Sequence, residues 1–284
     1  ISEKDTTKLN TLSENNKEQI EKLTETAIKN ADASEESADL IAKVVANASD
    51  ELVNKVVEEV SKNSTEENQA LSAKVMKSIV ETNPEKIETL SDDNKETMIT
   101  QTIEAAKNQA EGTSADEIDL TNTIAEIVTK SDTGTAAKVL ETLEEVSNKS
   151  DSKLSLSVVS NLTKQENYEE KMEILSVTSS VVEQSITKLV EKAVENASSE
   201  EDLEMVTNIV ENSKGTIADK VINSANKNEE SKKKITEVIV KVVEKNPEKA
   251  VEIIEKNKNT NTVLETVKTK IEKGEAVSTD DFEK

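Results

Sequence analysis

The chain repeats a short stretch of its own sequence at nearly constant intervals. Residues 8–18, KLNTLSENNKE, return as KIETLSDDNKE at 86–96 and, in part, as KMEILS at 171–176. A fourth copy is expected at Lys249, because the tetrapeptide NPEK ends there and also ends at Lys86. The steps between the four aligned lysines are 78, 85 and 78 residues. Spacing of this kind is typical of tandem repeats, in which neighbouring units share one continuous hydrophobic core.

Apolar residues occur as adjacent pairs four residues apart, which places two neighbouring apolar columns on one face of a helix. The pattern is clearest in five runs, namely Leu40, Ile41, Val44, Val45 and Ala48; Leu52, Val53, Val56, Val57 and Val60; Val75, Met76, Ile79 and Val80; Met205, Val206, Ile209 and Val210; and Val238, Ile239, Val242 and Val243. A step of four exceeds a 3.6-residue turn, so such a stripe stays on one face for only about three turns. The pattern therefore predicts short packed α-helices. It does not predict a long coiled coil, which needs a sustained 3.5-residue repeat, and no segment alternates for long enough to predict a strand.

Helix ends are marked by capping residues. Asn83 and Asn246 each precede Pro-Glu, which predicts an Asn cap followed by Pro at the first helical position. Three further pairs have the spacing of a capping box: Asn15 with Glu18, Ser114 with Glu117, and Ser198 with Glu201. The four glycines, at positions 112, 134, 215 and 274, all fall between apolar stripes and are expected near helix ends.

These observations predict an all-α protein made of tandem helical repeats, an α-solenoid-like array with about five short helices in each unit of about 80 residues. In the first unit we expect a short helix at 3–13 and longer ones at 16–31, 34–48, 50–63 and 65–81. The predicted units are 1–83, 84–167, 168–246 and a partial fourth unit at 247–274, followed by a frayed tail or linker at 275–284. Differences in unit length are expected in loops near Gly112 and Gly134.

The composition leaves one alternative to this fold. Leu, Ile, Val and Phe together make up about a quarter of the chain, only just above the roughly 20% below which a charged chain is usually disordered. A disordered tract is therefore the competing hypothesis. The regular order of the apolar residues, and not their amount, favours the helical array.

The formal net charge of −23 argues against a nucleic-acid partner and against adsorption to anionic lipid. The only cationic residue type is Lys, and the only aromatic residues are Tyr168 and Phe282. This charge balance fits a solvated surface in salty surroundings or a codon-biased genome equally well. No run approaches the roughly 20 apolar residues of a membrane span. Because the sequence begins at Ile1, we expect it to be a part of a longer product.

Few residues are candidates for chemistry. The chain has no Cys, His or Trp, so no disulfide, imidazole base or ordinary transition-metal site is predicted. Asp92–Asp93 and Asp280–Asp281 are possible Ca²⁺ ligands, but neither pair extends to an EF-hand spacing, and capping or solvation is the favoured interpretation. No carboxylate falls in an apolar stripe, so no acid–base pair of carboxylates is predicted.

Other motifs are weak. Ser150–Lys153 and Ser185–Lys188 match the SxxK pattern, and five Asn-X-Ser/Thr sequons begin at residues 47, 63, 148, 161 and 196; matches of both kinds are expected by chance in this composition. The basic run Lys232–Lys234 has acidic neighbours on both sides and is expected to be a solvated helix start. We therefore predict no catalytic, cofactor-binding or metal-binding residues.

The favoured function is a non-enzymatic structural repeat region of a larger surface-exposed protein, a stalk, sheath, filament or lattice that works by assembling with itself or with companion subunits. The expected location is extracellular or on the cell surface. A virion fibre or tail component remains an alternative. A second class of function is an α-solenoid scaffold that binds a peptide or protein, although the chain lacks the Trp and Arg that favour binding hot spots.

Overall fold

The computed structural model of the chain describes residues 34–62, 65–112, 119–149, 153–213, 216–257 and 262–282, together with residues 19, 22 and 26–29. All regular secondary structure in these ranges is helical, and they contain no strand. The chain divides into two compact units, residues 1–146 and 147–284. The all-α prediction is confirmed. The predicted helices at 3–13 and 16–31 lie almost entirely outside the described residues.

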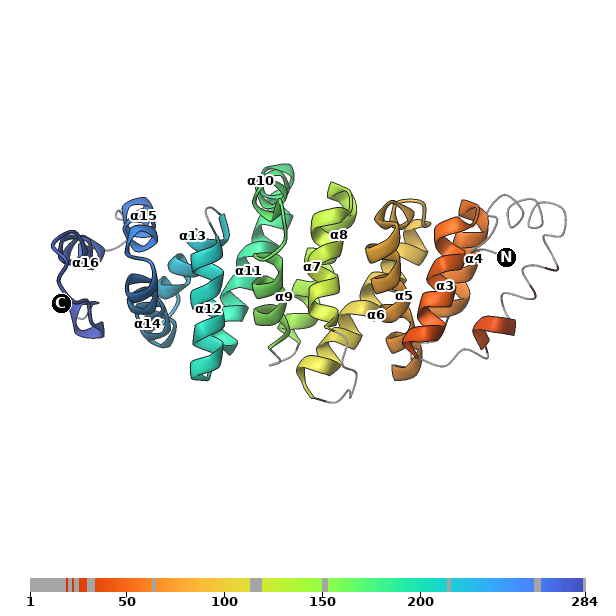
Figure 1. Cartoon of the computed structure of the whole chain (residues 1–284), viewed down its shortest axis with the longest axis horizontal. Coiled ribbons are helices and arrows are strands. Elements are labelled where there is room, and N and C mark those ends of the chain that lie inside the picture. Colours follow the sequence, from red (N-terminus) through yellow and green to blue (C-terminus); the bar gives the residue numbers. More distant parts are fainter. Residues whose placement is uncertain are drawn as a thin grey trace. The chain divides into compact units, whose positions relative to one another are not determined.

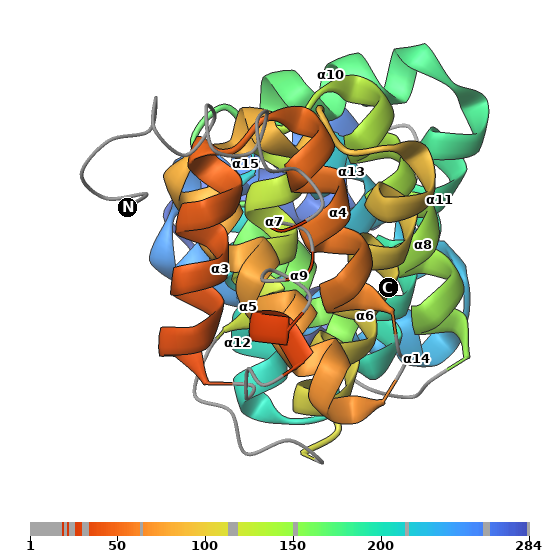
Figure 2. The same ribbon diagram turned by 90° about the vertical axis from the view of Figure 1, so that its right-hand side faces the viewer.

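The first unit is a set of packed helices with one short 3₁₀ segment (Figure 1). Its elements are α3 (Glu35–Asn47), α4 (Asp50–Ser61), α5 (Glu66–Thr82), η1 (Pro84–Ile87), α6 (Asp92–Ala110), α7 (Leu120–Lys130) and α8 (Thr133–Asn148). Helix α5 is central and contacts α3, α4, α6 and α7. The end-on view shows α3 and α4 side by side, as their contacts require (Figure 2).

The second unit has the same all-helical character. Its elements are α9 (Leu154–Leu162), α10 (Tyr168–Thr178), α11 (Ser180–Asn196), α12 (Glu200–Asn212), α13 (Thr216–Asn223), η2 (Ser224–Asn226), α14 (Glu229–Lys245), α15 (Pro247–Asn257), α16 (Thr262–Glu272) and η3 (Thr279–Phe282). Helix α11 contacts α9, α10, α13 and α14, whereas α12 contacts α9, α13 and α14. No helix among the described residues is both long and apolar enough to cross a membrane.

The predicted apolar stripes form the buried faces of most helices. All five residues predicted for α4 are buried, from Leu52 to Val60, and so are all four predicted for α5, from Val75 to Val80. The prediction for α3 was wrong in part, because Leu40 is 56% exposed. There the buried face is formed by Ala38, Ala42 and Val45, with spacings of four and three residues. Small residues at this face allow α3 to approach α5 closely.

Two predicted Asn caps behave differently after similar junctions. Asn83 follows α5 and Asn246 follows α14, and each donates its backbone N–H to a carbonyl in the last turn of the preceding helix. The Asn246 side chain accepts a hydrogen bond from the Lys249 N–H at 3.1 Å and caps α15, as predicted. Asn83 makes no side-chain cap, and the segment after it is a single 3₁₀ turn. The cap predicted at Asn83 was therefore wrong.

The predicted capping box at Ser198 and Glu201 was displaced by one residue. Helix α12 is capped instead by Ser199, which accepts from the Asp202 N–H at 3.1 Å, while the Asp202 carboxylate accepts from the Ser199 N–H at 3.0 Å. Ser and Asp satisfy the same pairing as Ser and Glu with a shorter side chain. The predicted boxes at 15/18 and 114/117 lie wholly or partly outside the described residues.

Two glycines have the positive φ values that favour glycine at helix ends. Gly112 follows α6 with φ 71°, and Gly274 follows α16 with φ 69°. At the end of α16 the Gly274 and Glu275 N–H groups donate to the Ile271 and Lys270 carbonyls, both at 2.9 Å, which is the Schellman arrangement. Gly134 also lies near a helix end, as predicted, but inside the first turn of α8. Gly215 lies outside the described residues.

The segment after Gly274 is not frayed as predicted. It ends in the 3₁₀ helix η3, which contacts α14 and α16. The Asp281 carboxylate is buried, pairs with Lys270 and accepts a hydrogen bond from the Ser278 N–H at 2.9 Å. These bonds hold the segment against α16 and occupy the carboxylate of Asp281, one of the two residues considered as Ca²⁺ ligands at this end of the chain.

Candidate functional site

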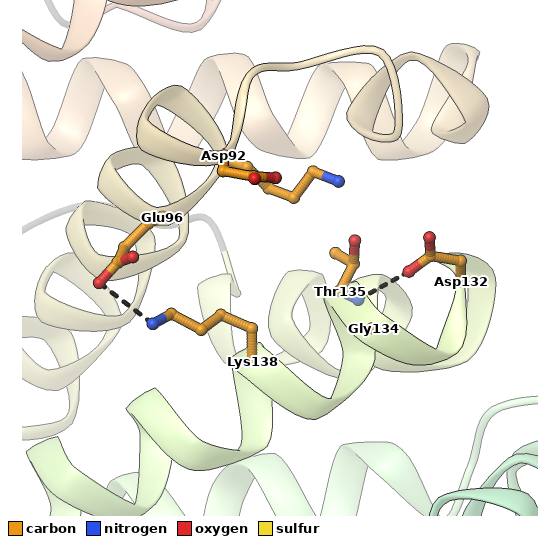
Figure 3. Close-up of a pocket in the computed structure, with 7 residues that line it drawn as sticks. Asp92, Glu96, Asp132, Gly134, Thr135 and Lys138 are labelled. Atoms are coloured by element: carbon orange, nitrogen blue, oxygen red, sulfur yellow. Dashed lines mark hydrogen bonds and ion pairs between the residues drawn. The ribbon is translucent and has the colours of Figure 1, made fainter. Parts of the chain in front are cut away.

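A polar cleft in the first unit is the candidate site. It has a volume of about 360 Å³ and lies between the start of α6 and the start of α8 (Figure 3). The cleft is lined by Asp92, Lys95, Glu96, Asp132, Gly134, Thr135 and Lys138. We refer to this set as the polar cleft.

One wall of the polar cleft is the first turn of α6. Ser91 caps this helix by accepting from the Asn94 N–H at 3.4 Å. Asp92, Lys95 and Glu96 then follow at helical spacings of three and four residues, which places them on one face. The sequence favoured helix capping or solvation for Asp92 and Asp93, whereas the cap of α6 is Ser91, and the sequence did not predict the cleft.

The opposite wall is the start of α8. The Asp132 carboxylate accepts from the Thr135 N–H at 2.7 Å and so caps this helix. That hydrogen bond lowers the pKa of Asp132, against the opposing effect of burial. Lys138, one turn further along, pairs with Glu96 of α6 at 3.1 Å across the cleft (Figure 3).

Glu88, immediately after η1, ties the two walls together. One oxygen of its carboxylate accepts from the Asp132 N–H at 2.9 Å, and the other accepts from the Thr135 hydroxyl at 3.0 Å. Lys95 pairs with the same carboxylate at 3.2 Å. Glu88 therefore satisfies groups at the N-terminus of α8, where a negative charge is favourable.

The side chains of the polar cleft and Glu88 hold the start of α6 against the start of α8 through hydrogen bonds and ion pairs. Glu88, Lys95 and Asp132 already bond one another's groups or the α8 backbone, so their charges are used within the protein. Within the described residues, no group of three or more acidic side chains is placed to hold a metal ion. Asp92 lies in the cleft and Asp93 in the same helical turn, and the structure does not gather further ligands around them for Ca²⁺.

The second unit contains a buried carboxylate that the sequence did not reveal. Asp202 is 3% exposed, whereas no carboxylate was assigned to an apolar stripe from the sequence. It accepts from Lys153 Nζ at 2.7 Å and from the Ser198 and Ser199 N–H groups, each at 3.0 Å. Burial raises the pKa of Asp202, but these hydrogen bonds outweigh burial and lower the pKa to about 2. Asp202 is thus a fixed negative charge that ties the start of α9 to the start of α12.

Ion pairs also join α12 to α14. Lys241 pairs with Glu200 and with Glu204, and Lys245 pairs with Glu204 and with Glu211. We call these five residues the ion-pair ladder. Hydrogen bonding to Glu200 raises the pKa of Lys241, and hydrogen bonding to Glu204 raises that of Lys245. The ladder connects residues about 40 positions apart, so it could not be recognised from local spacing.

The basic run Lys232–Lys234 is only partly a solvated helix start. Lys232 and Lys233 are exposed, but Lys234 is half-buried and donates to the Val194 carbonyl at 3.4 Å and the Glu195 carbonyl at 2.8 Å. Those carbonyls belong to the last turn of α11, where cations are favourable. Lys234 is thus a capping residue for a neighbouring helix.

The SxxK matches do not form a nucleophilic site where they can be seen. Ser185 is buried in α11 while Lys188 is exposed, and Lys153 is engaged by Asp202. Ser150 lies outside the described residues.

Comparison of the chain with protein-family models, with curated proteins and with solved structures finds no match.

Proposed function

We propose that this chain is a tandem helical-repeat region of a larger, surface-exposed protein, with a non-enzymatic structural role based on assembly with itself or with companion subunits. The observation that carries the proposal is a recurring packing arrangement. In the first unit α5 contacts α6 and α7, and in the second unit α9 contacts α11 and α12. Under the repeat register of the sequence, α9, α11 and α12 are the counterparts of α5, α6 and α7.

The order of elements supports the same register. Residues 84–167 contain η1 and then α6, α7, α8 and α9, and residues 168–246 contain α10, α11, α12, α13 and α14. If the three-residue η2 (Ser224–Asn226) is set aside, the described parts of each range contain five helical elements, which agrees with the proposed register. A single unit of this kind leaves one helix layer uncovered, so its stability would depend on its neighbours.

Burial supports the register at the level of residues. Ile87, Met172 and Ala250 are aligned by it and are all buried. Leu90, Leu175 and Ile253 are also aligned, and they too are buried. The repeated motif around Lys86 and Lys171 thus has a common inner face in different helices, which is what a shared repeat architecture requires.

The polar groups favour a structural role over a chemical one. Glu88, Asp202 and Lys234 each use their charge to cap or clamp a neighbouring helix. The net charge of −23 opposes close packing between chains, so assembly should depend on added salt or on divalent cations. We propose an extracellular or cell-surface location, with a virion fibre or tail as the alternative.

Electron microscopy and sedimentation of the purified chain and of its full-length parent protein test this function. The conditions to compare are low salt, high salt and added Ca²⁺. Ordered oligomers, filaments or lattices that form on screening or on Ca²⁺ addition are the expected result. Monodisperse monomers under every condition would contradict assembly and leave the scaffold function as the better explanation.

The scaffold alternative is favoured by one observation. Ile174, Val177 and Val181 are exposed apolar side chains within a few residues of one another. A binding scaffold would use such a surface, and a companion subunit in an assembly would use it too.

A further inference from the structure

Three exposed apolar side chains gather where α10 meets α11. Ile174 is 42% exposed, Val177 is 82% exposed and Val181 is 55% exposed. Ile174 and Val177 lie three residues apart on α10, and Val181 lies in the first turn of α11, just after Ser179, whose extended backbone separates the two helices. We call these three residues the apolar patch. The other large apolar side chain with comparable exposure in the described residues is Leu40, on α3 in the first unit.

The apolar patch replaces charged or polar surface found in the other units. In the repeat register, Val177 and Val181 align with Asp92 and Glu96, both of which are exposed. One repeat further on, Ile174 and Val177 align with Glu252 and Glu255, which are also exposed. The inner positions of the motif stay apolar in every one of these units, so only the outward positions have changed. An apolar surface at positions that otherwise carry charge indicates a contact specific to this unit.

The charge around the apolar patch indicates what it contacts. Residues 166–184 include five carboxylates, at 166, 169, 170, 173 and 183, and one lysine, Lys171. Glu170 and Glu173 are exposed and lie four residues before Ile174 and Val177, which places them beside the patch on α10. A second copy of the chain docked here would bring the same carboxylates together. A partner whose apolar side chains are flanked by lysines would pair with them.

We propose that the apolar patch docks a cationic amphipathic helix of a companion protein. Ile174, Val177 and Val181 would receive the apolar face of that helix, and Glu170 and Glu173 would pair with lysines at its edges. This inference rests on the repeat register used for the proposed function, and it names the chemistry of the companion. It adds a docking surface at positions where the second and fourth units carry exposed carboxylates.

The decisive variant places the residues of the second unit in the patch: Ile174→Thr, Val177→Asp and Val181→Glu together. These side chains are exposed, so the fold should be retained, which far-UV circular dichroism and the thermal midpoint will check. The probe is a labelled 14-residue helical peptide of Leu and Lys with one apolar face. A control peptide has the same sequence with each Lys replaced by Glu. Binding is measured by fluorescence anisotropy at low and moderate salt. Leu40→Asp is the matched control for loss of an exposed apolar residue elsewhere.

The triple variant gains two negative charges, so it separates patch binding from general attraction to an acidic protein. We expect it to bind the Leu/Lys peptide at least tenfold more weakly than the native chain, with Leu40→Asp unchanged. Equal or tighter binding by the triple variant would overturn the proposal, because it would show attraction by charge alone. Equal binding of the Leu/Glu peptide would overturn it as well. Self-association of the native chain that the triple variant abolishes would identify a second copy as the occupant and would overturn the cationic partner. None of these peptide-binding outcomes decides the proposed function, which is tested separately by electron microscopy and sedimentation.

Discussion

Replacing Asp202 by Asn removes a buried charge while keeping the shape of the side chain. Asp202 is bonded to Lys153 Nζ at 2.7 Å and to two backbone N–H groups at the start of α12. Its pKa falls from an ordinary value of 3.8 to about 2 in the folded protein. With about 1.4 kcal/mol for each pH unit, the ionised carboxylate contributes about 2 kcal/mol to the free energy of unfolding. We expect Asp202→Asn to lose that amount at pH 7.

The pH dependence of this loss follows from the direction of the shift. Because the folded pKa is the lower one, the contribution is nearly complete above about pH 4 and is largely lost as the pH falls toward 2. The difference in unfolding free energy between the native chain and Asp202→Asn should therefore shrink to about 0.4 kcal/mol at pH 2, where about half of the folded carboxylate is protonated. Urea titrations followed by circular dichroism at pH 7, 4 and 2 measure this difference, in which the acid-induced changes common to both proteins cancel.

Glu201→Gln is the matched control, since Glu201 is exposed on the same helical turn. It should change the unfolding free energy by less than about 0.5 kcal/mol at every pH. A loss in Asp202→Asn that is the same at pH 7 and pH 2 would refute the reasoning, because it would come from packing and not from charge. So would a loss at pH 7 no larger than that of the control.

Three further outcomes can be measured by chemical or thermal unfolding. Val56→Asp should cost several kcal/mol, about 3 or more, because Val56 is 1% exposed and the new charge has no partner, whereas Lys62→Ala on the exposed face should be nearly silent. Gly134→Ala should stabilise the protein by about 0.4–1 kcal/mol, because Ala loses less backbone entropy than Gly on folding and its Cβ fits, with Asp132 Oδ1 at 3.5 Å. Gly274→Ala should instead destabilise the protein by about 1 kcal/mol, because the φ of Gly274 is 69°. The isolated fragment 84–167 should show no cooperative melt, and a sharp transition in that fragment would contradict a core shared between neighbouring units.

The parts of the fold that could be predicted from sequence are those set by local spacing. The stripes of α4 and α5 are buried as predicted because their valines, isoleucines and leucines recur every three or four residues. Leu40 fits the same pattern yet is exposed, because small Ala38 and Ala42 allow α3 to pack on a different face. A periodic pattern identifies an amphipathic helix, but it does not decide between two neighbouring faces when both carry apolar residues.

The candidate site was missed because its partners are distant in sequence. Glu88 bonds the start of α8, 44 residues later, and Lys153 bonds Asp202, 49 residues later. Each of these residues alone resembles an ordinary surface charge in a chain that is 33% charged. The one local signal was the capping box at the start of α12, and it was assigned one residue early because Ser198 and Ser199 are adjacent and both fit the spacing.

The ion-pair ladder of α12 and α14 is built with redundancy. Each of its two lysines contacts two glutamates, and Glu204 contacts both lysines. Removal of any one glutamate leaves Lys241 and Lys245 each with a carboxylate partner. In evolutionary terms, the glutamates of this surface can be substituted one at a time without loss of the ion pairing between α12 and α14. Asp202 has no such substitute, so the surface of α12 should drift in sequence long before its buried N-terminal carboxylate does.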